Sequence, residues 1–113
     1  MKIDERKNGE VVILDIEAEI DLYNAPVLSK YLQDTLDKGH LKVVMNLSQV
    51  PFVDSSGIGA LVSSLALYQE NNGIFVLSNL QKSIQDLLNY IQLADQFLIF
   101  GEESEAIEFF EED

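Results

Sequence analysis

The sequence predicts a single α/β domain with a mixed, mostly parallel sheet of four to five strands and helices packed against it. From Leu41 onward the apolar pattern alternates strand, helix, strand, helix, strand, helix, and this alternation is typical of parallel strands joined by right-handed crossovers. Before Leu41, a turn dipeptide between two strand-like segments indicates an N-terminal β-hairpin. The chain has 113 residues and no internal repeat or linker, so one domain over residues 1–113 is expected.

The hairpin turn is expected at Asn8-Gly9, a dipeptide favoured in two-residue turns because both positions accept positive φ. Antiparallel strands should then occupy Lys2–Lys7 and Glu10–Glu17. One face of the second strand is wholly apolar and carries Val12, Leu14 and Ile16.

The segment "IDLYNAPVLSKYLQDTLDKGH" predicts a loop followed by a helix. Asn24 can cap this helix, Pro26 falls in its first turn, where the missing N–H has no cost, and Gly39 ends it. Its buried stripe repeats every four residues and consists of Leu28, Leu32 and Leu36, with Tyr31 beside them.

The next segment, "LKVVMNL", is a nearly continuous apolar run, which is typical of a strand covered on both faces. The helix after it carries Ile58, Leu61, Val62 and Leu65 and ends at Asn71-Asn72-Gly73. A strand "IFVL", a helix marked by Leu80, Ile84, Leu87, Leu88 and Ile91, and a short strand "FLIF" complete the alternation.

From about residue 102 the chain is strongly acidic. Seven of its twenty acids fall in Glu102–Asp113, and no base accompanies them. We expect a solvated, partly frayed end with a last helix. The apolar side of that helix would consist of Ala106, Ile107 and Phe110.

The formal charge of −13 excludes some classes of partner. Nucleic acids and anionic membrane surfaces both bind through Lys and Arg, of which there are 7 against 20 acids. The chain has no cysteine, so disulfide and thiol chemistry are excluded, and a reducing, cytoplasmic location fits. The first residues, "MKIDERKNGE", lack the apolar stretch of a signal peptide. The longest uncharged run, Ser55–Gln69, is shorter than the roughly 20 residues of a membrane helix, so no membrane insertion is expected.

The stretch "VPFVDSSGIGALV" combines an acid, two hydroxyls and two glycines where a strand gives way to a helix. Asp54, Ser55 or Ser56 can cap that helix, and one interpretation is purely structural: a cap that contributes about 1 kcal/mol, with glycines needed for packing. However, a glycine in a helix costs up to about 1 kcal/mol relative to alanine. Gly57 and Gly59 could therefore keep the backbone bare so that another molecule can approach it.

This stretch could support three kinds of chemistry. A nucleotide-binding loop is excluded because no lysine follows Gly59, and a metal site has neither clustered His nor Cys to form it. A serine nucleophile needs a base, but the one histidine, His40, is expected at the opposite edge of the sheet. The third possibility is that Ser55 accepts a phosphoryl group from another protein, which requires only an accessible hydroxyl at a helix start.

The segment "VMNLSQVPFVDSSGIGALV" resembles the signature of the STAS-domain anti-sigma factor antagonists, and "EIDLYNAPVL" and "VLSNLQKSIQDLLNYIQLADQF" extend the resemblance over essentially the whole chain. It implies a STAS-like fold and a regulatory protein that is not an enzyme and has no cofactor, catalytic residue or metal. In that family the unphosphorylated protein binds an anti-sigma factor that is also a serine kinase, and so releases the sigma factor. Phosphorylation of the serine after the aspartate ends the binding, and a phosphoserine phosphatase restores it.

Carried over by motif, the resemblance makes Ser55 the phosphorylation site, with Ser56 as the alternative acceptor. It implies a partner-binding surface formed by Asp21, Asn24, Asp54, Ser56, Gly57 and Gly59. The chain has Ala18 where the family commonly has a glycine, which puts the shape of that loop in question. A second hypothesis is a scaffold subunit of a transporter or stress-signalling complex without a phosphorylation cycle, and a third is a small serine hydrolase.

Overall fold

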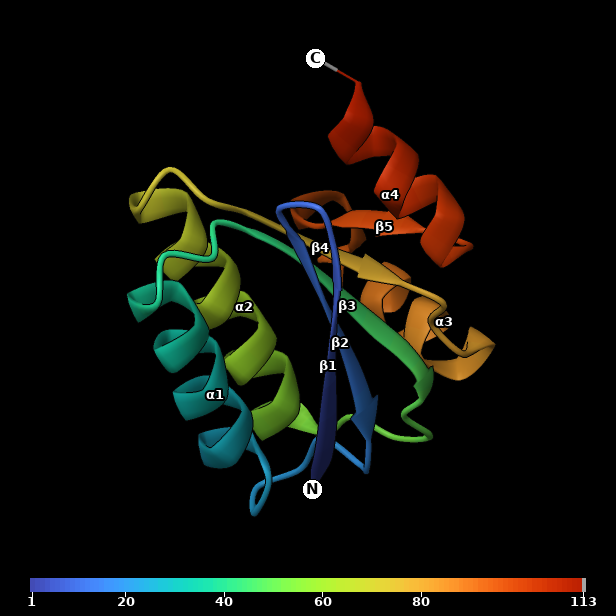
Figure 1. The fold of residues 1–113 in the computed structure, drawn as a ribbon. Coiled ribbons are helices and arrows are strands. Elements are labelled where there is room, and N and C mark those ends of the chain that lie inside the picture. The colour runs from blue at the N-terminus through green and yellow to red at the C-terminus, as the bar shows by residue number, and fades with distance from the viewer. Residues whose placement is uncertain (113) are drawn as a thin grey trace.

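The strands and helices alternate as predicted in the computed structural model, which describes residues 1–112 (Figure 1). The elements in chain order are β1 (Lys2–Asn8), β2 (Val11–Glu17), α1 (Ala25–Asp37), β3 (Lys42–Gln49), α2 (Ser55–Glu70), β4 (Ile74–Ser78), α3 (Lys82–Tyr90), a 3-10 helix η1 (Ala94–Gln96), β5 (Leu98–Phe100) and α4 (Glu103–Glu111). No helix among these residues is both long enough and apolar enough to span a bilayer.

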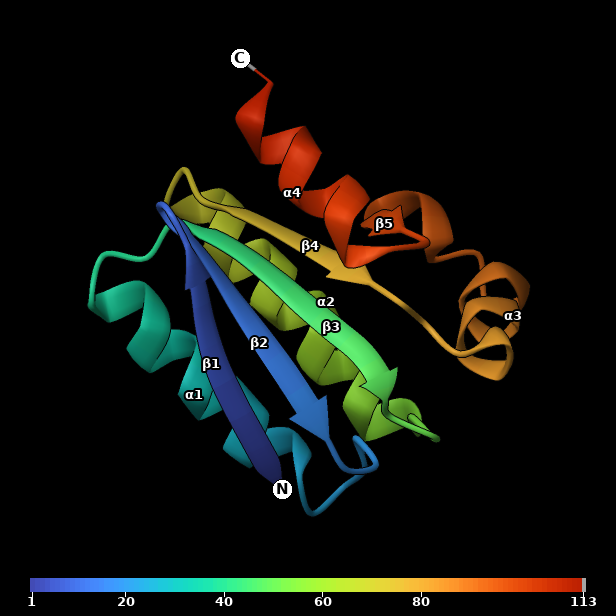
Figure 2. The same ribbon diagram turned by 45° about the vertical axis from the view of Figure 1, so that its right-hand side comes forward.

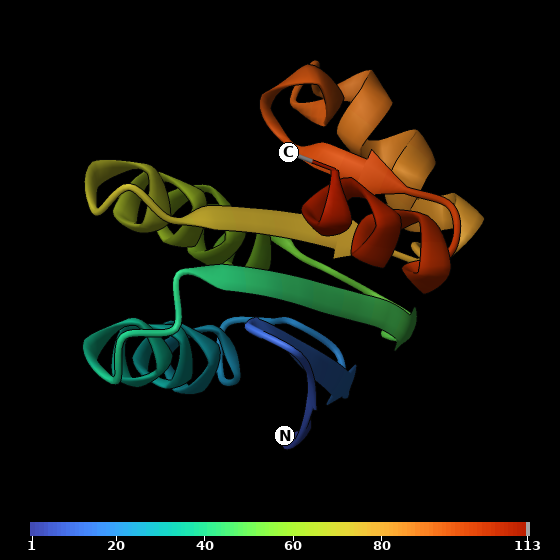
Figure 3. The same ribbon diagram turned by 45° about the horizontal axis from the view of Figure 1, so that its top comes forward.

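The five strands form one mixed sheet in the order β1-β2-β3-β4-β5, which Figure 3 shows running from blue to orange. β1 is antiparallel to β2, and all other neighbours are parallel. Helices α1 and α2 cover one face, and α4 crosses the other over β3, β4 and β5 (Figure 2). The predicted fold class, with an N-terminal hairpin and a mostly parallel sheet, is confirmed.

The hairpin turn lies one residue later than predicted. Asn8 pairs with Val11, so the two turn residues are Gly9 and Glu10. Within the turn only Gly9 has a positive φ, of 61°. A two-residue turn with glycine at its first position needs positive φ at that residue alone, which explains why Glu10 is accepted at the second.

The sheet has an apolar core on each face. The larger core, on the side of α1 and α2, contains the predicted Val12, Leu14 and Ile16 together with Leu28, Leu32 and Leu36 of α1. The smaller core, on the side of α4, consists of Val11, Ile13, Val44, Val76, Ala106 and Phe110. Consecutive residues of β2 and β3 are therefore buried on opposite faces, as the continuous apolar run "LKVVMNL" predicted for β3.

The last helix expected at the acidic end is confirmed as α4, and it is packed against the sheet where a solvated, partly frayed end was expected. Ala106 and Phe110 of α4 are buried against the sheet. The helix start is held by a reciprocal pair in which Glu102 accepts from the backbone of Glu105 and Glu105 accepts from the backbone of Glu102. The guanidinium of Arg6 also bridges Glu103 to the sheet. Two buried side chains and three polar contacts thus offset the mutual repulsion of the acids.

Candidate functional site

Two loops meet at the carboxyl edge of the parallel strands, at the bottom of Figure 1. The β2–α1 loop and the β3–α2 loop are joined by an isolated parallel bridge between Ile20 and Val53. The N–H of Ile20 donates to the carbonyl of Phe52 (2.9 Å), and the N–H of Asp54 donates to the carbonyl of Ile20 (3.2 Å). The two acids predicted to share a surface, Asp21 and Asp54, therefore follow directly from paired segments.

Asp54 is the cap of α2, which decides between the three residues that the sequence left open. One carboxylate oxygen accepts from the N–H of Gly57 (2.9 Å), and the other accepts from the N–H of Leu22 in the neighbouring loop (3.0 Å). The side chain thus holds the start of the helix and the β2–α1 loop together. Ser55 and Ser56 are the first two residues of the helix and are free of the capping role.

Gly57 and Gly59 have different environments although they stand two residues apart in one helix. A Cβ atom at Gly57 would lie 2.0 Å from the carbonyl oxygen of Ile20 and 2.7 Å from Cγ1 of Val53, whereas at Gly59 it would meet nothing within 4 Å. Gly57 is buried. Its missing side chain therefore serves the approach of the neighbouring loop inside the fold, and only Gly59 leaves an exposed, bare backbone.

Asp21 shapes the loop that precedes α1. One of its carboxylate oxygens accepts from the N–H groups of Tyr23 (3.0 Å) and Asn24 (2.9 Å). Asn24 forms no side-chain cap at α1, contrary to the prediction, because its amide donates to the carbonyl of Glu19 (2.9 Å). Pro26 lies in the first turn of α1, and Gly39 follows the helix with a φ of 89°, both as predicted.

Ala18 raises no difficulty for the shape of this loop. The residues with positive φ within 1–112 are Gly9, Gly39, Asn72, Asn79 and Gln92, so Ala18 has a backbone conformation that any residue adopts. A glycine at this position is therefore unnecessary in this chain.

The Ser55 side chain is exposed at the first position of α2, and its hydroxyl forms no hydrogen bond within residues 1–112. In the same part of the chain, the backbone N–H groups of Ser55 and Ser56 have no acceptor. They belong to the positively polarised end of a 16-residue helix. A hydroxyl beside two unused donors is chemically suited to carry an anionic group.

The two joined loops, which precede α1 and α2, carry large exposed apolar side chains that were not predicted from the sequence. Leu22 and Tyr23 of the β2–α1 loop are 62% and 83% exposed, and Phe52 of the β3–α2 loop is 54% exposed. The sequence does contain an indication of this exposure. These large apolar residues stand next to "DSSG" and "EID" but do not fit the periodic apolar pattern of any predicted helix or strand. Such neighbouring exposed side chains are typical of a protein-binding surface.

The comparisons with known proteins identify the family. The sequence profile of the STAS domain matches residues 2–106. The chain belongs to the STAS-domain family.

A Thermotoga maritima protein assigned to the anti-sigma factor antagonists is 31% identical over 100 residues, which cover 88% of each chain. The anti-sigma-B factor antagonist of Bacillus subtilis is 29% identical over 96 residues, which cover 84% of this chain and 86% of the relative. A crystal structure of an assigned antagonist from Thermotoga maritima superposes with a TM-score of 0.89 at 29% identity, covering 94% of this chain and 92% of that one.

The scaffold hypothesis has weaker support among STAS-domain proteins. A sulfate transporter family protein from Wolinella succinogenes superposes with a TM-score of 0.79, but its identity of 19% shows the fold alone. The relatives of higher identity are named as anti-sigma factor antagonists, a class of regulatory protein.

His40 lies at the edge of the sheet opposite Ser55, as predicted. It lines a hollow together with Gly9 of the β1–β2 turn and Lys42 at the start of β3. Since the chain has one histidine, Ser55 has no imidazole base within reach, and a serine hydrolase of the usual kind is not supported.

Proposed function

We propose that this STAS-domain protein is a cytoplasmic anti-sigma factor antagonist controlled by phosphorylation of Ser55. In this proposal the unphosphorylated protein binds an anti-sigma factor that has serine kinase activity and so releases the sigma factor. The observation that carries the proposal is the exposed, unbonded Ser55 hydroxyl at the first position of α2, next to the joined loops of Asp21 and Asp54. The named relatives of similar length support the regulatory class.

The chemistry of the switch requires little from this chain. The bound kinase transfers the terminal phosphoryl group of its nucleoside triphosphate to Oγ of Ser55: the bond from that phosphorus to the bridging oxygen breaks, the nucleoside diphosphate leaves, and the hydroxyl proton passes to a base of the kinase. The phosphate adds about −1.5 to −2 charges and can accept from the free N–H groups of Ser55 and Ser56. The cap of α2 is provided by Asp54, so modifying Ser55 leaves the helix start intact. A phosphoserine phosphatase then hydrolyses the ester and restores the hydroxyl.

The proposed docking surface consists of two kinds of residue. Leu22, Tyr23 and Phe52 provide exposed apolar area, and Gly59 leaves the backbone of α2 accessible. Asp21, Asn24 and Asp54 fix the shape of the loops through their hydrogen bonds, and Ser56 lies half-buried beside the acceptor. Gly57 contributes from inside the fold, by allowing the Ile20 loop to approach.

The loss of binding follows from electrostatics. A doubly charged group within an interface that faces like charge costs several kcal/mol. A loss of about 3 kcal/mol is more than a hundredfold in affinity, which is sufficient to separate bound from free protein.

The test measures binding to a kinase-type anti-sigma factor from the same organism by calorimetry, with and without ATP. We expect Ser55→Ala to bind in both conditions, Ser55→Asp to bind at least tenfold more weakly, and the natural protein to be released with ATP as its mass rises by one phosphate. Ser56→Ala is the matched control and should behave as the natural protein. Release and phosphorylation of Ser55→Ala to the natural extent would refute Ser55 as the acceptor, and equal binding by Ser55→Ala and Ser55→Asp would refute the switch.

A further inference from the structure

Most basic side chains of this acidic protein are paired with a carboxylate, but two are not. Within residues 1–112, five of the seven Lys and Arg side chains lie within 4.0 Å of a carboxylate. The two that do not, Lys7 and Lys38, both belong to the amino edge of the parallel strands. Lys7 precedes the β1–β2 turn, and Lys38 directly follows α1. Lys7 lines a hollow at this edge, and Lys38 does not.

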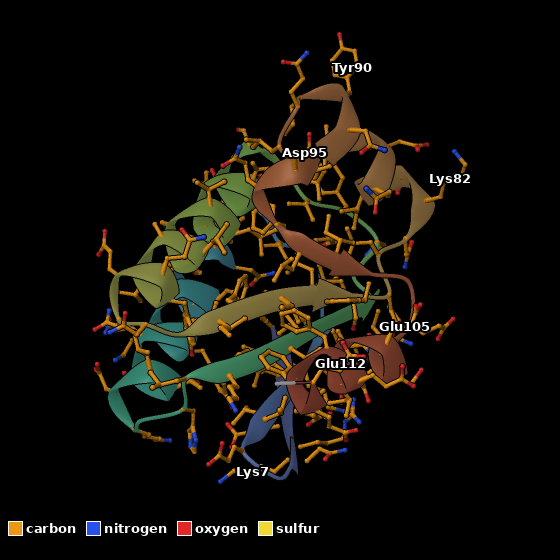
Figure 4. The ribbon with its side chains drawn as sticks, turned by 90° about the horizontal axis from the view of Figure 1, so that it is seen from above. Lys7, Lys82, Tyr90, Asp95, Glu105 and Glu112 are labelled. Atoms are coloured by element: carbon orange, nitrogen blue, oxygen red, sulfur yellow. The ribbon has the colours of Figure 1, made fainter. Side chains whose placement is uncertain are left out.

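A hollow lies at this edge, between the β1–β2 turn and the α1–β3 loop. It is lined by Lys7, Gly9, Glu10, Val12, Gly39, His40, Leu41 and Lys42. Three of these residues carry basic side chains and one carries an acid. Figure 4 looks down on this edge and shows Lys7 at the hairpin, well apart from Lys82 of α3.

The charged side chains that line this hollow leave one positive charge in excess, because they comprise two lysines, Lys7 and Lys42, and one carboxylate, Glu10. Glu10 pairs with Lys42 at 3.2 Å, but its side chain is 85% exposed, and an ion pair of that kind contributes little. Within residues 1–112, the backbone N–H groups of Gly9 and Glu10 have no backbone acceptor. The hollow thus combines two lysine ammonium groups, one imidazole and two unused N–H donors, all of which are partners for an anion.

We propose that this hollow is a binding site for a small oxyanion, a phosphate or carboxylate group, at the edge of the sheet opposite Ser55. In this site Lys7 supplies the excess positive charge, and Lys42, His40 and the N–H groups of the turn are the further hydrogen-bond donors that line it. The site is independent of the docking surface, because it shares no residue with the β2–α1 or β3–α2 loops.

The test is a titration of the 15N-labelled protein at constant ionic strength, in which the amide chemical shifts report binding. Inorganic phosphate and citrate are titrated separately, and chloride is the reference anion. We expect saturable shifts of the amides of Gly9, Gly39 and His40 with at least one of the two probes. Saturation by phosphate alone assigns a phosphate ligand, and saturation by citrate alone assigns a carboxylate ligand.

The variant Lys7→Gln/Lys42→Gln should weaken the binding by about tenfold or more, because it removes both ammonium donors of the hollow. The matched control is Lys30→Gln/Lys82→Gln, which changes the net charge equally at exposed i,i+4 pairs away from the hollow and should leave the affinity unchanged. Shifts that do not saturate, shifts equal to those with chloride, or equal weakening by both double variants would overturn the proposal.

Discussion

The contact between Gly57 and the Ile20 loop gives the sharpest test of how the site is built. In Gly57→Ala, the new Cβ lies 2.0 Å from the Ile20 carbonyl oxygen and must separate to the 3.4 Å at which ordinary contact begins. Both neighbours are held, since Ile20 pairs with Val53 and its carbonyl accepts from Asp54. Neither backbone can move without breaking that pairing.

The size of the effect follows from two opposing contributions. Overpacking of this kind costs about 1–3 kcal/mol, and the lost bridge between Ile20 and Val53 adds to it. Replacing glycine by alanine in a helix contributes up to about 1 kcal/mol in the other direction. We therefore expect Gly57→Ala to lower the free energy of unfolding by about 2 kcal/mol.

Gly59→Ala is the matched control, because the same substitution two residues later enters open space. It should raise the free energy of unfolding by up to about 1 kcal/mol. Urea denaturation followed by far-UV circular dichroism measures both, and thermal midpoints should differ by about 4 °C per kcal/mol. If the two variants agreed within about 0.5 kcal/mol, the close approach of Ile20 would not be the reason for glycine at position 57.

Three further predictions concern single side chains. Asp54→Ala should cost about 1–2 kcal/mol of stability in urea denaturation and speed the hydrogen exchange of the Leu22 amide, since both hydrogen bonds of the carboxylate are lost; an unchanged exchange rate would contradict the link between the loops. Hydrogen bonding by Arg6 lowers the pKa of Glu103. The pair therefore stabilises the fold at pH values above the ordinary carboxyl pKa, and this contribution is lost as the pH falls through the lowered pKa. In Arg6→Gln, NMR of the carboxyl groups should show the pKa of Glu103 rising toward its ordinary value. Tyr68 is fully buried, burial raises its pKa, and its hydroxyl has no partner within residues 1–112, so Tyr68→Phe should be neutral or stabilising by up to about 1 kcal/mol in thermal unfolding, and a loss of that size would reveal an unseen partner.

The fold class was predictable because apolar periodicity reports burial directly. The continuous run of β3 and the stripe of Leu28, Leu32 and Leu36 record which faces are covered, and each is buried as expected. Periodicity contains no information about strand order, so the sequential order β1 to β5 could not be derived from it. The helix of the acidic end was predicted by its apolar residues, but its anchor was not, because Arg6 and Glu103 are 97 residues apart.

The sequence predicted where the site lies but not which residue has which role within it. Asp54, Ser55 and Ser56 are equivalent as caps by residue type, and only the position of the Leu22 N–H selects Asp54. Gly57 and Gly59 are likewise the same residue in the same helix, and they differ only in what the β2–α1 loop places beside them. Long-range contacts made these distinctions, and no local pattern contains them.

The distribution of charge explains why Ser55 is suited to a switch under the proposed function. Although the chain has a net charge of −13, α2 carries no charged residue from Ser55 to Gln69. Its exposed positions over this span are Ser55, Gly59, Val62, Ser63, Ala66 and Gln69. A phosphate on Ser55 would therefore be the first net charge within this span of α2, beside the carboxylate of Asp54 that caps the helix. A partner packed at the start of α2 would have to accommodate about two additional negative charges beside Asp54, and this electrostatic cost is what the proposed switch uses.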